Sequence, residues 1–95
     1  MADPTLLVLA SLAAGEKHGY AITDDVETFA GVRLGPGTLY GALTRLEEKG
    51  WIRPVATDDR RRPYRLTAEG HRHLEEQLAE LNQIVKIGFR RLRPA

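Results

Sequence analysis

The sequence predicts a mainly helical fold in which three helices precede a two-stranded β-hairpin and one long C-terminal helix. Three observations support this prediction. Apolar residues recur at helical spacing in four segments. Glycines stand at the boundaries of most of these segments. Two short β-prone runs flank a polar stretch, TDDRRR, at residues 57–62. With 95 residues, the chain is expected to form one domain with a modest core.

The composition excludes several classes of protein. It is that of an ordinary globular chain, 42% hydrophobic and 28% charged. The absence of cysteine excludes disulfides and thiolate metal sites. The longest apolar run, residues 6–14, is shorter than the roughly 18 residues of a membrane span. The N-terminus lacks the basic start of a secretory signal, so we expect a cytoplasmic protein.

The net charge of +1 conceals an uneven distribution. Residues 1–32 carry one lysine against five acidic residues, whereas residues 33–72 carry nine cationic residues against five acidic ones. A basic middle third points weakly to a polyanionic partner. On charge alone, an ordinary solvated surface is the favoured explanation of the pattern.

Capping residues and glycines predict where the first two helices begin and end. Asp3 and Pro4 are a capping residue and a first-turn proline for a helix that runs to Ala14, before Gly15. This helix is apolar nearly all round, so it must be covered on several sides, and we expect a partner subunit to supply part of that cover. The second helix opens at residues 18–19 and closes at Gly31, with an apolar stripe at residues 22, 26 and 29. Residues 32–34 are β-prone.

The third helix follows the turn at residues 35–37 and stops at Gly50. Leucines 39, 43 and 46 predict its core face, and its opposite face carries Thr38, Tyr40, Gly41, Thr44 and Arg45. A tyrosine beside a glycine that permits close approach indicates a contact surface. Alternatively, the tyrosine ring packs on a neighbour and the glycine has no special role.

The remaining elements are a hairpin and a long helix. Residues 51–56 and 63–66 are β-prone and can pair, which leaves residues 57–62 as an exposed tip. A proline in each run makes both strands edge-like or irregular. Thr67 caps a last helix that runs to about residue 92, and six of its residues form a heptad seam spaced 4, 3, 4, 3, 4: Leu74, Leu78, Leu81, Val85, Gly88 and Leu92. This element order predicts a winged helix-turn-helix, with a DNA-binding domain at residues 1–70 and a dimerisation helix at residues 71–95.

Several motifs resemble those of the PadR family of transcriptional regulators. They are HGYAI at residues 18–22, GPGTLYGAL at 35–43, RLE at 45–47, GWI at 50–52 and RRRPYRLTAEG at 60–70. The resemblance spans roughly residues 5–75, with the motifs in the family's order. It implies a homodimeric winged-helix protein, in many cases a repressor, that binds an inverted-repeat operator in double-stranded DNA and is released by a small aromatic or drug-like effector.

The resemblance also implies roles for individual residues. The DNA contacts would come from the start of the second helix, from the third helix and from the wing. The residues are Tyr20 in the second helix, Thr38, Tyr40, Thr44 and Arg45 in the third, and Arg60, Arg61 and Arg62 in the wing. The seam of the last helix and the apolar first helix would form the dimer interface through Leu6, Leu9, Leu74, Leu78, Leu81, Val85 and Leu92. Three further residues are candidates for an effector pocket beside that interface: Leu12, Ile84 and Phe89. Ordinary dimer core is the alternative interpretation of this apolar set.

The wing arginines suit a phosphate backbone, because the planar guanidinium binds phosphate oxygens at two points or enters a narrow minor groove. Arg45 has three open interpretations: a guanine edge, a phosphate, or an ion pair with Glu48. The chain departs from the family pattern at Gly41 and Pro63, where proline and a lysine or tyrosine are usual, and at Asp58 and Asp59 beside the wing. Its length is that of the short, single-helix subgroup.

An enzyme is not expected. The only serine, Ser11, falls inside the apolar first helix, and residues 35–38 lack the lysine of a phosphate-binding loop. His71 and His73 are two positions apart on a helix and point to different faces, so no metal site and no cofactor are expected. The alternative function is a winged helix that serves as a protein-interaction or dimerisation module and does not bind DNA specifically.

Overall fold

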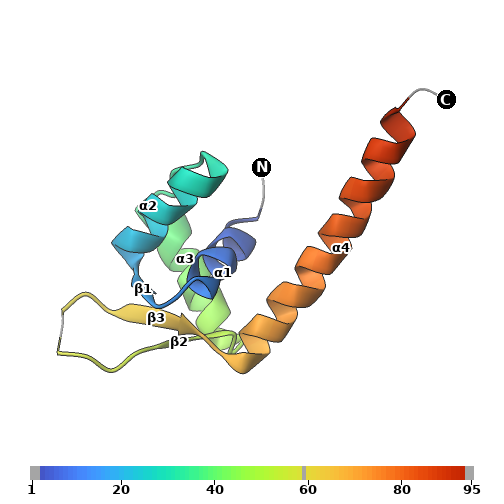
Figure 1. Ribbon diagram of the computed structural model, residues 1–95. Helices are drawn as coiled ribbons and strands as arrows, with labels where there is room; N and C mark the ends of the chain where they lie inside the picture. Colours follow the sequence, from blue (N-terminus) through green and yellow to red (C-terminus); the bar gives the residue numbers. More distant parts are fainter. Residues whose placement is uncertain (1–2, 59, 94–95) are drawn as a thin grey trace.

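The computed structural model describes residues 3–58 and 60–93 as a mainly helical winged helix with a small antiparallel sheet (Figure 1). The elements follow in the order α1 (Pro4–Ala13), β1 (Lys17–His18), α2 (Gly19–Ala30), α3 (Pro36–Glu48), β2 (Ile52–Pro54), β3 (Pro63–Leu66) and α4 (Ala68–Leu92). This order confirms the predicted fold class.

The ends of the helices are set by nearby residues, through capping hydrogen bonds and a glycine at the end of α2. The Asp3 carboxylate accepts a hydrogen bond from the backbone N–H of Thr5 at 3.0 Å and caps α1. The His18 Nδ1 atom accepts one from the N–H of Ala21 at 3.3 Å at the start of α2. Gly31 ends α2 at a φ of 69°, in the left-handed region that glycine adopts without strain.

The sheet has one strand more than predicted. β3 lies in the middle, in the order β1-β3-β2, and pairs antiparallel with both neighbours. The expectation of two edge-like strands therefore holds for β2 and is wrong for β3, which accommodates Pro63 as its first residue. β1 is two residues long, too short to show the period-2 pattern that identifies a strand. Residues 32–34 form no strand.

The core lies where α1 packs against α2, α3, α4 and β3. Leu6, Leu9 and Leu12 of α1 are 9%, 1% and 3% exposed within the single chain. A second subunit is therefore not needed to cover α1, and that reason for expecting one was wrong. Ile22 and Val26 of α2 are buried as predicted, whereas Phe29 is half exposed near the end of the helix.

α4 is held to the domain only by its first turns. Gly70 and Leu74 are its buried residues, and the helix then runs outward from the body of the domain (Figure 1). The predicted division at residue 70 falls within the first turn of this helix. Beyond that turn, the seam residues Leu78, Leu81, Val85 and Leu92 are exposed.

The start of α4 is fixed by contacts with the segment that joins α3 to β2. The Thr67 N–H donates to the carbonyl oxygen of Trp51 at 3.0 Å, and the Thr67 hydroxyl donates to the carbonyl oxygen of Gly50 at 2.7 Å. The same hydroxyl oxygen accepts the N–H of Gly70 and caps α4. The Trp51 ring stacks on His73, with centroids 3.7 Å apart.

Gly70 is required by this junction, because a Cβ atom there would overlap the carbonyl oxygen of Trp51. We expect Gly70→Ala to destabilise the fold by about 2–3 kcal/mol, the usual cost of forcing an extra methyl group into a packed site. Urea unfolding followed by circular dichroism measures the change.

Gly41→Ala is the matched control, since Gly41 lies inside α3 with no atom within 4 Å of the added Cβ. We expect this control to be about 0.5–1 kcal/mol more stable than the wild type, because alanine favours the helix. Equal stability of the Gly70→Ala variant and the wild type would contradict the junction described above.

Candidate nucleic-acid interface

A partly buried polar cluster joins the middle of α2 to the end of α1. The Ser11 hydroxyl is fully buried and donates to the Asp25 carboxylate at 2.7 Å. The Lys17 ammonium donates to the Ser11 carbonyl oxygen at 2.6 Å and lies 3.9 Å from the same carboxylate. Ser11 therefore has a structural hydrogen bond, and its hydroxyl is not accessible as a nucleophile. The cluster ties β1 to both helices.

Two exposed tyrosines project where α2 and α3 meet. Tyr20, in the first turn of α2, is 67% exposed, and Tyr40, in α3, is 57% exposed. Gly19 allows the Tyr40 ring to lie against the start of α2, because a Cβ atom there would lie 3.2 Å from the Tyr40 hydroxyl oxygen and 3.2 Å from Leu39. Large apolar rings left in solvent beside polar groups are typical of a contact surface.

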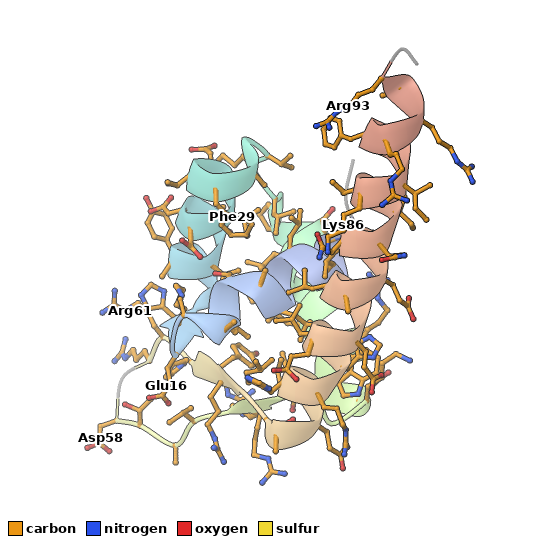
Figure 2. The ribbon with its side chains drawn as sticks, turned by 45° about the vertical axis from the view of Figure 1, so that its right-hand side comes forward. Glu16, Phe29, Asp58, Arg61, Lys86 and Arg93 are labelled. Carbon is orange, nitrogen blue, oxygen red and sulfur yellow. The ribbon has the colours of Figure 1, made fainter. Side chains whose placement is uncertain are left out.

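The wing arginines border the same place. Arg60, Arg61 and Arg62 line a hollow of about 520 Å³ together with both tyrosines. The remaining lining residues are His18, Gly19 and Tyr64. We call this hollow the tyrosine–arginine groove. Figure 2 shows Arg61 near the start of α2, with Asp58 farther out along the hairpin. Asp59 lies outside the described residues.

A second hollow, of about 580 Å³, lies on the other side of the tyrosine pair, between α2 and the start of α3. Its lining is largely apolar and comprises Tyr20, Thr23, Arg33, Leu34, Gly35, Pro36, Leu39 and Tyr40. The Arg33 guanidinium contacts Asp24 at 3.4 Å and Glu27 at 3.3 Å. The hydrogen bond to Asp24 and the charge of Glu27 raise the pKa of Arg33 above its ordinary value, so its positive charge is locally balanced.

The outer face of α3 carries the other predicted contacts. Thr38, Thr44 and Arg45 are all exposed. The Thr44 hydroxyl donates to the Tyr40 carbonyl oxygen at 2.9 Å, which leaves its oxygen free to accept. Arg45 lies away from the tyrosine–arginine groove, in a smaller hollow with Asp3, Thr5, Leu46, Lys49 and Trp51. Within residues 3–58 and 60–93, Arg45 forms no ion pair, so the expected alternative with Glu48 is not formed.

The predicted contact residues therefore divide into two groups. One group surrounds the tyrosine–arginine groove, and the other, Thr38, Thr44 and Arg45, lies along the exposed face of α3. Tyr40 belongs to the first group and lies between Thr38 and Thr44 in α3, so it joins the two groups. A helix with an exposed polar face beside a cationic hairpin is the arrangement with which winged helices dock on duplex DNA.

Residues 8–76 match the profile of the transcriptional regulator PadR-like family, which is most of the chain. The chain belongs to the PadR-like family of transcriptional regulators. Over 84 residues it is 34% identical to the transcriptional regulator Rv3488 of Mycobacterium tuberculosis, a match that covers 85% of this chain and 78% of that protein.

Two further comparisons place the chain among known sequences and structures. The chain is 51% identical over 75 residues, 79% of its length, to an uncharacterised 37.1 kDa protein in transposon TN4556 of Streptomyces fradiae. That match spans only 22% of the Streptomyces protein. The crystal structure of a PadR family transcription regulator from Clostridium difficile R20291 superposes with a TM-score of 0.86 at 29% identity, covering 97% of this chain and all of that one.

The PadR motifs did not single out every residue of the site. His18, Gly19 and Tyr64 line the tyrosine–arginine groove, although no contact role was predicted for them. The HGY motif at residues 18–20 was the available signal, since its histidine caps α2 and its glycine admits Tyr40. The largely apolar hollow between α2 and α3 gave no sequence signal, because its lining residues come from separate segments.

The predicted effector residues lie in different surroundings. Leu12 is 3% exposed in the core of the domain, whereas Ile84 and Phe89 are 65% and 62% exposed on the outer part of α4. A single chain therefore does not enclose a pocket with these three side chains. In the part of the chain that the structure describes, no three His, Cys, Asp or Glu side chains are grouped as for a metal, and no helix is long and apolar enough to span a membrane.

The position of Tyr40 can be tested through Gly19. We expect Gly19→Ala to displace the Tyr40 ring by a few tenths of an ångström, because the added Cβ would lie closer to its hydroxyl than ordinary van der Waals contact allows. Chemical shifts of the tyrosine ring protons report the displacement. Gly37→Ala, which has no atom within 4 Å of the added Cβ, is the control. Unchanged Tyr40 shifts in the Gly19→Ala variant would show that the contact does not form in solution.

Proposed function

We propose that the chain is a sequence-specific DNA-binding regulator whose α3 enters the major groove while the wing loop (residues 57–62) lies along the phosphate backbone. The observation that carries this proposal is the tyrosine–arginine groove, where exposed residues of α2, α3 and the wing border one hollow. Three consecutive exposed arginines concentrate positive charge there. A cytoplasmic regulator without catalytic activity fits this proposal.

Phosphate contacts and base contacts would come from different parts of the surface. The wing arginines and Tyr20 supply donors to phosphate oxygens, which fix the position of the protein on the duplex. The base contacts would come from the exposed face of α3. There, Thr38 and Thr44 each offer a hydroxyl group to base edges, and Arg45 offers its guanidinium. Arg45 is suited to a guanine edge because it is exposed and forms no ion pair with a carboxylate of the described chain.

The wing arginines should account for much of the dependence of DNA affinity on salt concentration. Each phosphate contact contributes about 0.9 to the slope of log affinity against log salt. We expect the variant with Arg60, Arg61 and Arg62 all changed to alanine to lose about 2–3 in this slope per wing, together with most of its affinity near physiological salt. Fluorescence anisotropy on the DNA upstream of the protein's own gene, across a salt series and against scrambled duplex, measures both quantities.

The control is Arg90→Ala, which removes a cation from the far end of α4 and should leave the slope nearly unchanged. Selective binding whose slope falls in the wing variant alone supports the proposal. If the wild type binds the upstream and scrambled duplexes equally weakly, selection of bound genomic fragments comes next. Absence of any enriched fragment would favour a protein-interaction module instead.

We further propose that the regulator is a homodimer on an inverted repeat, with half-sites about one DNA turn apart. The exposed apolar residues of α4 support this, since a lone soluble helix rarely leaves such a stripe in water. Repression would follow from occupancy of a promoter. Sedimentation equilibrium tests the assembly, and a monomeric mass at micromolar concentration would exclude a two-fold operator.

Release by a small aromatic or hydrophobic effector is the last part of the proposal. Its support is the apolar surface of Ile84 and Phe89, which a second subunit would convert into the wall of a pocket. A binding effector should raise the thermal midpoint of the wild type and less so that of Phe89→Ala. If no member of a panel of small aromatics shifts the wild-type midpoint, effector control at this place is excluded for those compounds.

A further inference from the structure

Gly41 stands in the interior of α3, where a glycine weakens the helix. After proline, glycine is the least favourable residue inside a helix, because its backbone loses the most conformational freedom on folding. Gly35 and Gly37 differ from it, since they lie at the N-cap and in the first turn of α3. The presence of glycine at position 41 therefore calls for a physical reason.

Two other glycines show what such a reason looks like inside the fold. Gly31 has a φ of 69°, which disfavours any other residue, and Gly70 leaves room for the carbonyl oxygen of Trp51. Gly41 has no positive φ. Apart from the backbone of α3 and the two adjoining residues, no atom of the described chain lies within 4 Å of a Cβ placed there. Any requirement for glycine at this position must therefore come from a molecule that α3 contacts.

The neighbours of Gly41 on the helix surface are the proposed base contacts. Residues three and four positions apart lie side by side on a helix. Thr38 and Thr44 are three positions before and after Gly41, and Arg45 is four positions after it. All three are exposed. Gly41 thus lies at the centre of the surface that α3 offers to base edges.

The two threonines have little reach. A threonine hydroxyl stands only one bond beyond Cβ, so it can contact a base edge only where the helix backbone lies close to the base pairs. A larger side chain between the two threonines would meet the bases first and hold the helix away. Arg45 is long and flexible, so it is less limited in this respect.

We infer that Gly41 is a positioning residue for sequence recognition, because the bare backbone there lets α3 lie deep enough in the major groove for Thr38 and Thr44 to contact base edges. This inference rests on the DNA-binding function proposed above and specifies the position that sets the depth of α3. The wing arginines belong to a different element and contact the phosphate backbone of any sequence. A side chain at residue 41 should therefore lower selectivity more than it lowers non-specific affinity.

Gly41→Leu and Gly41→Ala test the inference by adding side chains of increasing size. Fluorescence anisotropy is measured on the selectively bound duplex found as described above and on scrambled duplex. We expect Gly41→Leu to lose at least about tenfold in affinity for the selective duplex, because its side chain is forced against the bases. The affinity for scrambled duplex should stay within about twofold, and the salt slope should be unchanged. Gly41→Ala should show a smaller loss of the same kind.

Thermal unfolding and a control variant separate this effect from damage to the fold. Both Gly41 variants should unfold at or above the wild-type temperature, because alanine and leucine favour the helix. Thr28→Leu is the control, since it places the same side chain at an exposed position of α2, about 12 Å along the axis from Tyr20. It should leave both affinities unchanged.

The possible results have distinct meanings. If the wild type is selective and Gly41→Leu keeps its full affinity for the selective duplex, the inference is overturned while the proposed function stands. Equal losses on the two duplexes would also overturn it, because the side chain would then hinder all DNA contact. A wild type that binds every duplex equally would overturn the proposed function and the inference together.

A double-mutant cycle tests whether the depth of α3 acts through the threonines. Changing Thr38 and Thr44 together to alanine should cost several-fold in selective affinity in the wild type. The same change should cost little in the Gly41→Leu background, where the hydroxyls no longer reach the bases. Equal losses in both backgrounds, or no loss in the wild type, would show that Gly41 does not position the threonines and would overturn the inference.

Discussion

The carbonyl oxygen of Trp51 fixes how the wing, the end of α3 and the long helix meet. It accepts the N–H of Thr67 and lies so close to the first turn of α4 that only a hydrogen atom fits at residue 70. The Thr67 side chain completes the junction by bonding to the carbonyl oxygen of Gly50 and to the N–H of Gly70. The direction in which α4 leaves the domain depends on this junction, and the exposure of its seam depends on that direction.

Local chemistry made most of the fold predictable. Caps such as Asp3, prolines at the starts of α1 and α3, and Gly31 and Gly50 at helix ends act through nearby backbone atoms, so their effect is visible in a short stretch of sequence. The strand at residues 17–18 was not predictable in this way. It exists because β3 offers an unpaired edge, and that edge is supplied by residues far along the chain.

The sequence named most of the residues around the tyrosine–arginine groove, but it did not give their arrangement. The PadR motifs identified Tyr20, Tyr40 and the wing arginines, and the structure brings them around one hollow. They did not show that Arg45 lies apart from that hollow. The packing of α1 was misjudged because an apolar helix looks the same in sequence whether its own chain or a partner covers it. Only the burial of Leu9 and Leu12 within one chain distinguishes the two.

The stacking of Trp51 on His73 makes the intrinsic tryptophan fluorescence sensitive to the junction between α4 and the domain. Trp51 is the only tryptophan, and it lies where α4 joins the domain, with the Lys49 ammonium 5.1 Å from its ring centre. Its emission therefore depends on one place in the molecule. A change in the angle between the long helix and the winged domain would alter the stacking and hence the fluorescence. Rearrangement of the two parts on DNA could thus be followed without any attached dye.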